Sequence, residues 1–157
     1  MATSIIGFKE KRIDIDDNFL LLGLSYIKQS SESKNNPDWF KDYVNNIIDV
    51  MLDVKPVGWG YMELDDYIID DERKVFFNDL IDKTIDGLKN RDSNIIDFKE
   101  VNYLLDLKGL ELWKEKHFVD VEYVLRFLDD LKILLDDNTP LSHERLMKTH
   151  SNKNNSN

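Results

Sequence analysis

The chain has 157 residues, of which 33% are charged and 41% hydrophobic, and it contains no cysteine. This length predicts a single domain, and the hydrophobic content is sufficient for a buried core. The lack of cysteine excludes disulfides, thiolate nucleophiles, iron–sulfur clusters and cysteine zinc sites. The formal net charge of −10 argues against direct binding to nucleic acid, because phosphate contacts need clustered lysine and arginine.

The sequence shows neither a membrane segment nor a secretion signal. No apolar run approaches the roughly 18–20 residues that span a bilayer, and the N-terminal residues lack a charged stretch followed by an apolar one. We therefore expect a cytoplasmic protein that does not interact with membranes.

The N-terminal third of the chain predicts a short extended segment followed by two helices. Residues 4–15 alternate weakly, which indicates a short strand or an extended arm. A largely buried helix should begin after Asp16 or Asp17, either of which can cap it. A second helix should begin at Asn36-Pro37 and end near Val54.

The remaining elements are predicted from caps and apolar periodicity. A short helix could cover residues 63–69, and Asp70 or Asp71 should cap a longer one through about Lys89. Asp97 and Glu100 fit a capping box for the next helix, which should end near residue 109. Residues 110–119 are ambiguous between helix and strand, and a central core helix should cover 120–136.

These elements predict a mainly α fold. We expect a single-domain helical bundle of about five to six helices over residues 1–140, with a short N-terminal strand as a further element. Residues 141–157 are polar and of low complexity, which predicts a flexible C-terminal tail. The sequence leaves open whether the protein is a monomer or a homodimer.

The acidic residues concentrate on one predicted helix face. On an ideal helix at about 100° per residue, Asp42, Asp49 and Asp53 fall within about 60° of Asp38. The opposite arc is apolar and consists of Trp39, Phe40, Tyr43, Val44, Ile47, Val50, Met51 and Val54. Unlike a typical solvated face, the stripe has no lysine or arginine interspersed at i,i+4, so like charges face one another.

The segment that follows extends this charge. Residues 38–71 hold nine acids against Lys41 and Lys55, a local net charge of −7. Such a surface is either a solvated face or a complementary surface for a cationic protein. Metal binding is a weaker alternative, because Asp14, Asp16 and Asp17 lack the glycine and terminal glutamate of a calcium loop.

Catalytic and cofactor motifs are missing from the sequence. The three histidines, His117, His143 and His150, form no His-Glu-x-x-His pair, and the chain has no nucleophile elbow or glycine-rich phosphate loop. We therefore expect no enzymatic activity, no metal and no cofactor. The turn around Trp59 and Tyr61 could bury its aromatic rings or present them as an interface anchor.

In its size, acidity, lack of cysteine and helical stretch from Asp16 to about Asp71, the chain resembles the immunity proteins of bacterial toxin systems. These include the partners of contact-dependent growth inhibition toxins and colicin-type nucleases. The resemblance implies stoichiometric inhibition of a cognate toxin, commonly a basic nuclease, at its active site or an adjacent surface.

We therefore expect an immunity protein, or antitoxin, that neutralises a basic toxin. The alternatives are an acidic DNA mimic, another regulatory inhibitor and a helical scaffolding domain. The predicted partner-binding residues are Asp38, Asp42, Asp49, Asp53, Trp59, Tyr61, Glu63, Asp65, Asp66, Asp70 and Asp71.

Overall fold

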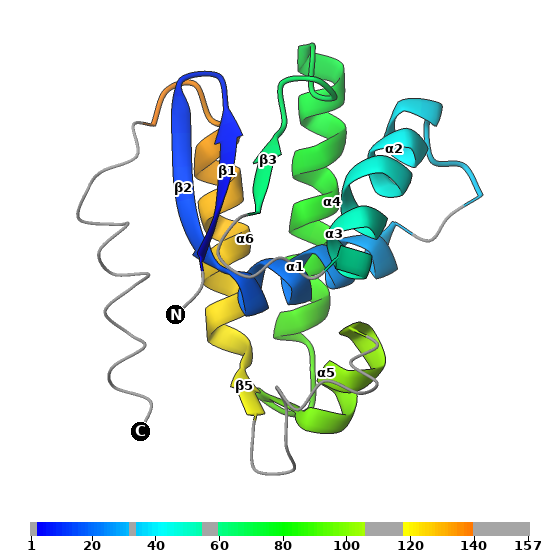
Figure 1. The fold of residues 1–157 in the computed structure, drawn as a ribbon, viewed down its shortest axis with the longest axis vertical. Coiled ribbons are helices and arrows are strands. Elements are labelled where there is room, and N and C mark those ends of the chain that lie inside the picture. The colour runs from blue at the N-terminus through cyan, green and yellow to red at the C-terminus, as the bar shows by residue number, and fades with distance from the viewer. Residues whose placement is uncertain (1–2, 32–33, 55–59, 106–117, 140–157) are drawn as a thin grey trace.

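A computed structural model describes residues 3–31, 34–54, 60–105 and 118–139 (Figure 1). Trp59, the predicted helix end near residue 109, most of the ambiguous segment 110–119 and the predicted tail at 141–157 lie outside these ranges. Within the described ranges the chain is mainly helical, with short strands in two small sheets.

The first sheet is built from the N-terminal hairpin and a strand far along the chain. Strands β1 (Thr3–Phe8) and β2 (Lys11–Asp16) pair antiparallel, and β3 (Tyr61–Glu63) pairs parallel to the other edge of β1. Ile13 and Ile15 alternate with exposed residues on β2, which buries one face of the hairpin. The weak alternation at residues 4–15 is therefore two strands.

Three helices form the core with this sheet. Helix α1 (Asp17–Ser30) is capped by Asp16, α4 (Asp71–Lys89) by Asp70, and α6 (Val121–Leu135) by Asp120. Helix α6 packs against α1, α4 and the hairpin, and Figure 1 shows it behind β1 and β2. Its buried residues include Phe127, Leu128, Leu131 and Leu134, each 0% exposed, which confirms the expected central helix.

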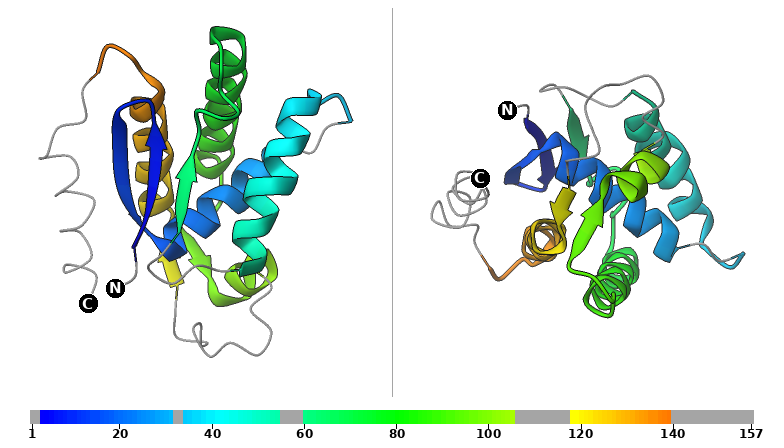
Figure 2. Two further views of the ribbon diagram at one scale, coloured as in Figure 1. Left: turned by 45° about the horizontal axis from the view of Figure 1, so that its top comes forward. Right: turned by 90° about the horizontal axis from the view of Figure 1, so that it is seen from below.

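The predicted second helix is a continuous helix with an irregular centre. It consists of α2 (Asp38–Tyr43), the π-helical turn η1 (Val44–Ile48) and α3 (Asp49–Val54). Figure 2 shows it at the periphery, on the side of the molecule away from the hairpin. Its N-terminal half is anchored by Phe40 and Tyr43, which pack against Phe77 of α4.

A second small sheet holds the remaining helix. Strands β4 (Ile95–Asp97) and β5 (Phe118–Asp120) pair antiparallel, and α5 (Phe98–Leu105) follows β4 directly. The Asp97 carboxylate accepts the Glu100 amide at 2.9 Å, as the capping box predicts. The Glu100 side chain points elsewhere, toward Arg91 and Tyr26.

The expectation of a mainly α bundle is correct only in part, since the fold is mixed α/β. The predicted short helix at residues 63–69 is wrong: residue 63 ends β3, and Leu64 then begins a single turn in which its carbonyl accepts the Tyr67 and Ile68 amides. The pairing of β3 with β1 joins residues more than 50 positions apart, which local periodicity cannot reveal.

Candidate functional site

The acidic outer face of α2 and α3 is the first part of the predicted partner surface. Asp38, Asp42 and Asp53 are exposed, and the Asp38 side chain keeps 99% of its accessible area. Asp38 has Lys41 at 3.7 Å, whereas neither Asp42 nor Asp53 forms an ion pair with another described residue. Together with Lys41, these three carboxylates therefore carry a net negative charge among the described residues of α2 and α3.

Asp49 does not belong to that outer face. Its carboxylate lies 2.6 Å from the Lys28 ammonium of α1, and its side chain is 39% exposed. The predicted stripe of four aspartates is thus interrupted, because the π turn rotates α3 relative to α2. Asp49 instead connects α3 to α1.

The π turn also overturns part of the predicted apolar arc. The Asp49 amide donates to the Val44 carbonyl, an i→i−5 hydrogen bond. A turn with one extra residue rotates the side chains that follow it by about −100° around the helix axis, relative to their positions in an uninterrupted α-helix. Val50 and Val54, expected on the buried arc, are therefore 49% and 48% exposed.

Glu63 and Asp65 form a second group that faces the β1–β2 hairpin. Glu63 pairs with Arg12 at 3.2 Å, and the Tyr61 hydroxyl donates to the Glu63 carboxylate. Both oxygens of Asp65 accept the backbone amide of Lys9 at 2.9 Å. The hydrogen bond between Glu63 and Asp65 raises the pKa of Glu63 and lowers that of Asp65.

Asp70 and Asp71 stand at the start of α4. Asp70 is the N-cap, and its carboxylate accepts the Arg73 amide at 2.8 Å. Asp71 occupies the exposed first turn, where its negative charge interacts favourably with the positive end of the helix dipole. Asp66 is exposed between these groups.

Cations offset much of the charge at this end of the molecule. Asp137 pairs with Lys9 at 2.8 Å and with Lys74 at 2.9 Å, and these ammonium groups lower the pKa of Asp137 to about 2. The acids of residues 63–71 thus lie among Lys9, Arg12 and Lys74, whereas Asp42 and Asp53 have no ion-pair partner among the described residues.

Aromatic contacts hold the two acidic segments next to one another. The Tyr43 ring lies 5.2 Å from that of Tyr67, and the Arg73 guanidinium lies 5.1 Å from the ring centre of Trp39. Tyr61, by contrast, is 56% exposed on β3, where its hydroxyl donates to Glu63. Of the two predicted aromatic anchors, only Tyr61 lies in the described part of the chain.

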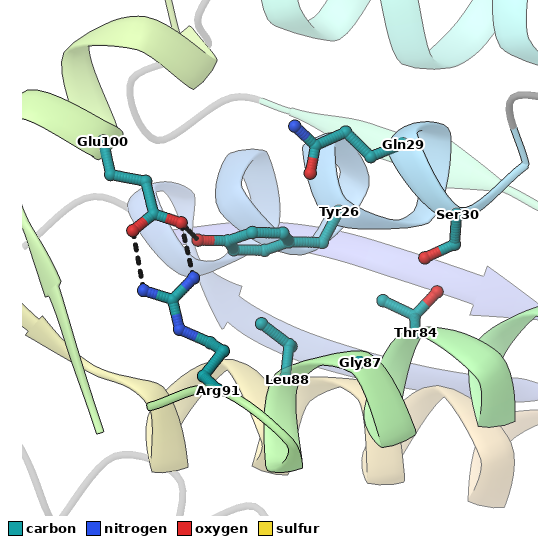
Figure 3. Close-up of a pocket in the computed structure, with 8 residues that line it drawn as sticks. All are labelled: Tyr26, Gln29, Ser30, Thr84, Gly87, Leu88, Arg91 and Glu100. Carbon is teal, nitrogen blue, oxygen red and sulfur yellow. Dashed lines mark hydrogen bonds and ion pairs between the residues drawn. The ribbon is translucent and has the colours of Figure 1, made fainter. Parts of the chain in front are cut away.

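A polar pocket of about 230 Å³ lies between α1, α4 and α5 (Figure 3). Glu100 accepts hydrogen bonds from Tyr26 at 2.7 Å and from Arg91 at 2.6 and 2.7 Å. Burial and the bond to Glu100 raise the pKa of Tyr26, so its phenol stays protonated. These contacts attach α5 to α1 and to the residues after α4, and sequence reasoning did not anticipate them.

The chain matches no protein-family model, no curated protein and no solved structure. Across the described ranges, no helix is long and apolar enough to cross a bilayer. Within those same ranges, no three or more histidine and acidic side chains gather as a metal site would require. His117, His143 and His150 lie outside them.

Proposed function

We propose that the chain is an immunity-type protein that binds and neutralises a basic toxin through the outer face of α2 and α3. The observation that carries this proposal is that Asp38, Asp42 and Asp53 are exposed and that two of them, Asp42 and Asp53, have no cationic partner within the described residues. Exposed Asp66 and Asp71 extend the charge beyond this helix.

A toxin that acts on nucleic acid needs lysine and arginine for the phosphates, and an acidic face can occupy the same groups. Complementary charge of this kind mainly accelerates association and sets specificity. Helix α2 is also anchored in the core, because Phe40 and Tyr43 are 0% and 1% exposed. A pre-positioned face loses little conformational freedom on binding.

The decisive variant carries Asp42→Lys and Asp53→Lys, which reverse the charge of the two acids that have no ion-pair partner among the described residues. Asp49 is left unchanged because it pairs with Lys28. The matched control is Asp79→Lys with Asp86→Lys on the exposed side of α4, which changes the net charge by the same amount.

The experiment captures partners from the source organism with the purified wild-type chain and tests the captured protein for toxicity. We expect a basic toxin that binds the wild type and the α4 control but not the α2–α3 reversal. Co-expression of the wild type should restore growth of cells that express the toxin. Capture of many nucleic-acid-binding proteins would instead favour a DNA mimic, and equal binding by all three chains would contradict the proposed surface.

A further inference from the structure

The outer face of the α2–α3 helix changes character along its length. The exposed row runs through Asp38, Asp42, Asn46, Val50 and Val54, in steps of four residues. Its first half is acidic, its centre is a neutral amide and its last half is apolar. The two valines are 49% and 48% exposed, whereas Val101 and Val124 on other helices are 0% exposed; Val75 on α4 is a further exposed valine, at 58%.

The π turn is what makes this row straight. In an uninterrupted α-helix each four-residue step advances by about 40°, so Val50 and Val54 would lie about 120° and 160° from Asp38. The rotation of about −100° at η1 brings Val50 and Val54 to within about 60° of Asp38 around the helix axis. The same turn leaves Ile48 at 0% exposure, so the helix stays anchored while α3 presents its valines outward.

We propose that this row is a two-part docking surface for an amphipathic, basic helix of a protein partner. This inference deepens the proposed function, on which it rests, by naming the partner's chemistry at the same face. The partner helix would place apolar side chains against Val50 and Val54 and lysine or arginine against Asp38, Asp42 and Asp53.

Charge and dimensions favour this occupant. Asp53 lies between the two valines in sequence, and Asp42 lies two four-residue steps before Val50, with Asn46 between them. The apolar patch therefore has acidic neighbours, which favour a partner whose apolar patch has basic neighbours. The row from residue 38 to 54 is about 24 Å long at 1.5 Å per residue, the length of a helix of about 16 residues. Side chains of two helices interdigitate along such a row.

The test uses two synthetic 18-residue peptides as probes. The first has leucines at helical spacing on one face and lysine elsewhere, and the second has glutamine in place of each leucine. Affinities for wild type, Val50→Ser with Val54→Ser, and a matched control of Ile69→Ser with Val75→Ser are measured by fluorescence anisotropy. Ile69 and Val75 are 63% and 58% exposed and lie outside the row, and circular dichroism checks that each variant is folded.

We expect wild type to prefer the leucine peptide. The Val50/Val54 variant should bind it about fivefold more weakly while its affinity for the glutamine peptide is unchanged, because only apolar contact area is removed. Amide shifts induced by the leucine peptide should map to residues 38–54. An equal loss in the Ile69/Val75 control, or no preference between the peptides, would overturn the proposal.

The proposal would also be overturned by evidence that the row binds something other than a partner helix. A concentration-dependent dimer that dissociates in the Val50/Val54 variant would identify a second copy of this chain. Amide shifts that spread from this substitution to residues 106–117 without peptide would identify a segment of the same chain.

Charge reversal separates this inference from the proposed function. If Asp42→Lys with Asp53→Lys leaves both peptide affinities unchanged while the valine effect persists, the acidic interface fails and the apolar one stands. If charge reversal weakens both peptides and the valine substitutions weaken neither, the acidic interface stands and the two-part surface fails.

Discussion

The Lys28 ammonium on α1 lies 2.6 Å from the Asp49 carboxylate at the start of α3. Both side chains are about 40% exposed, so this ion pair adds little to stability. The ion pair instead shows how α3 is oriented, because it marks the side of α3 that faces α1. With Asp49 turned to α1, the next outward positions are Val50 and Val54.

The orientation of α3 can be tested by thiol labelling, because the chain has no cysteine of its own. Single Val50→Cys and Val54→Cys variants should react with a thiol reagent in the folded protein nearly as fast as the unfolded chains do. The matched control is Ile48→Cys, whose position is 0% exposed and should be strongly protected. Protection of both valine positions would show that α3 has the orientation of an uninterrupted α-helix.

The contact between Gly23 on α1 and Phe127 on α6 should tolerate no added methyl group. A Cβ at Gly23 would overlap Cε1 and Cδ1 of the fully buried Phe127 ring. Gly23→Ala should therefore lower the free energy of unfolding by about 1–3 kcal/mol, as overpacked cores do. Urea denaturation measures the change.

Gly87→Ala on α4 is the control for that substitution. A Cβ there meets no atom within 4 Å, so alanine should stabilise the helix by about 0.4–1 kcal/mol through its smaller unfolded-state entropy. Equal effects of the two alanines would contradict the close approach of α1 and α6.

Asp65 should stabilise the hairpin turn. Lys9 has a φ of 54°, an uncommon conformation for a residue with a side chain, and its amide donates to both oxygens of Asp65. Asp65→Ala should reduce the free energy of unfolding by about 1–2 kcal/mol, since it removes hydrogen bonds to a charged group. Asp66→Ala, at the exposed neighbouring position, should change it by less than about 0.5 kcal/mol.

Acid should weaken the attachment of α5. The bond from Arg91 lowers the pKa of Glu100 below its ordinary value of about 4.3. A group whose pKa is depressed in the folded state stabilises the fold above its unfolded pKa and loses that contribution as the pH falls through the folded value. Between pH 7 and pH 3, wild type should therefore lose more stability than Glu100→Gln in urea denaturation. Equal losses would show that Glu100 is not linked to folding.

The helices with strong caps could be predicted closely from the sequence. Asp16 and Asp70, each one of two predicted caps, cap their helices, because N-cap hydrogen bonds depend on residues two or three positions away. The last helix begins within one residue of its predicted start and is capped by Asp120. The small sheets could be predicted only in part, since β3 pairs with β1 across more than 50 residues and each strand of that pair is short.

The helix that carries the predicted acidic stripe was predicted correctly, but the rotation of its second half was not. A projection at about 100° per residue assumes a regular α-helix throughout. Residues 44–48 contain neither proline nor glycine, so this stretch gives no local sign of the π turn. The one local signal was the apolar composition of α3, where Val50, Met51, Leu52 and Val54 exceed what a single buried stripe requires.

The central claim is that the outer face of α2 and α3 binds a basic toxin. Its most direct test is the equilibrium dissociation constant for the captured toxin, measured by titration calorimetry at 50 and 300 mM salt. Wild type should bind tightly and weaken at least about tenfold at the higher salt, whereas Asp42→Lys with Asp53→Lys should abolish binding with unchanged helicity. Equal dissociation constants for the two chains, independent of salt, would contradict the claim.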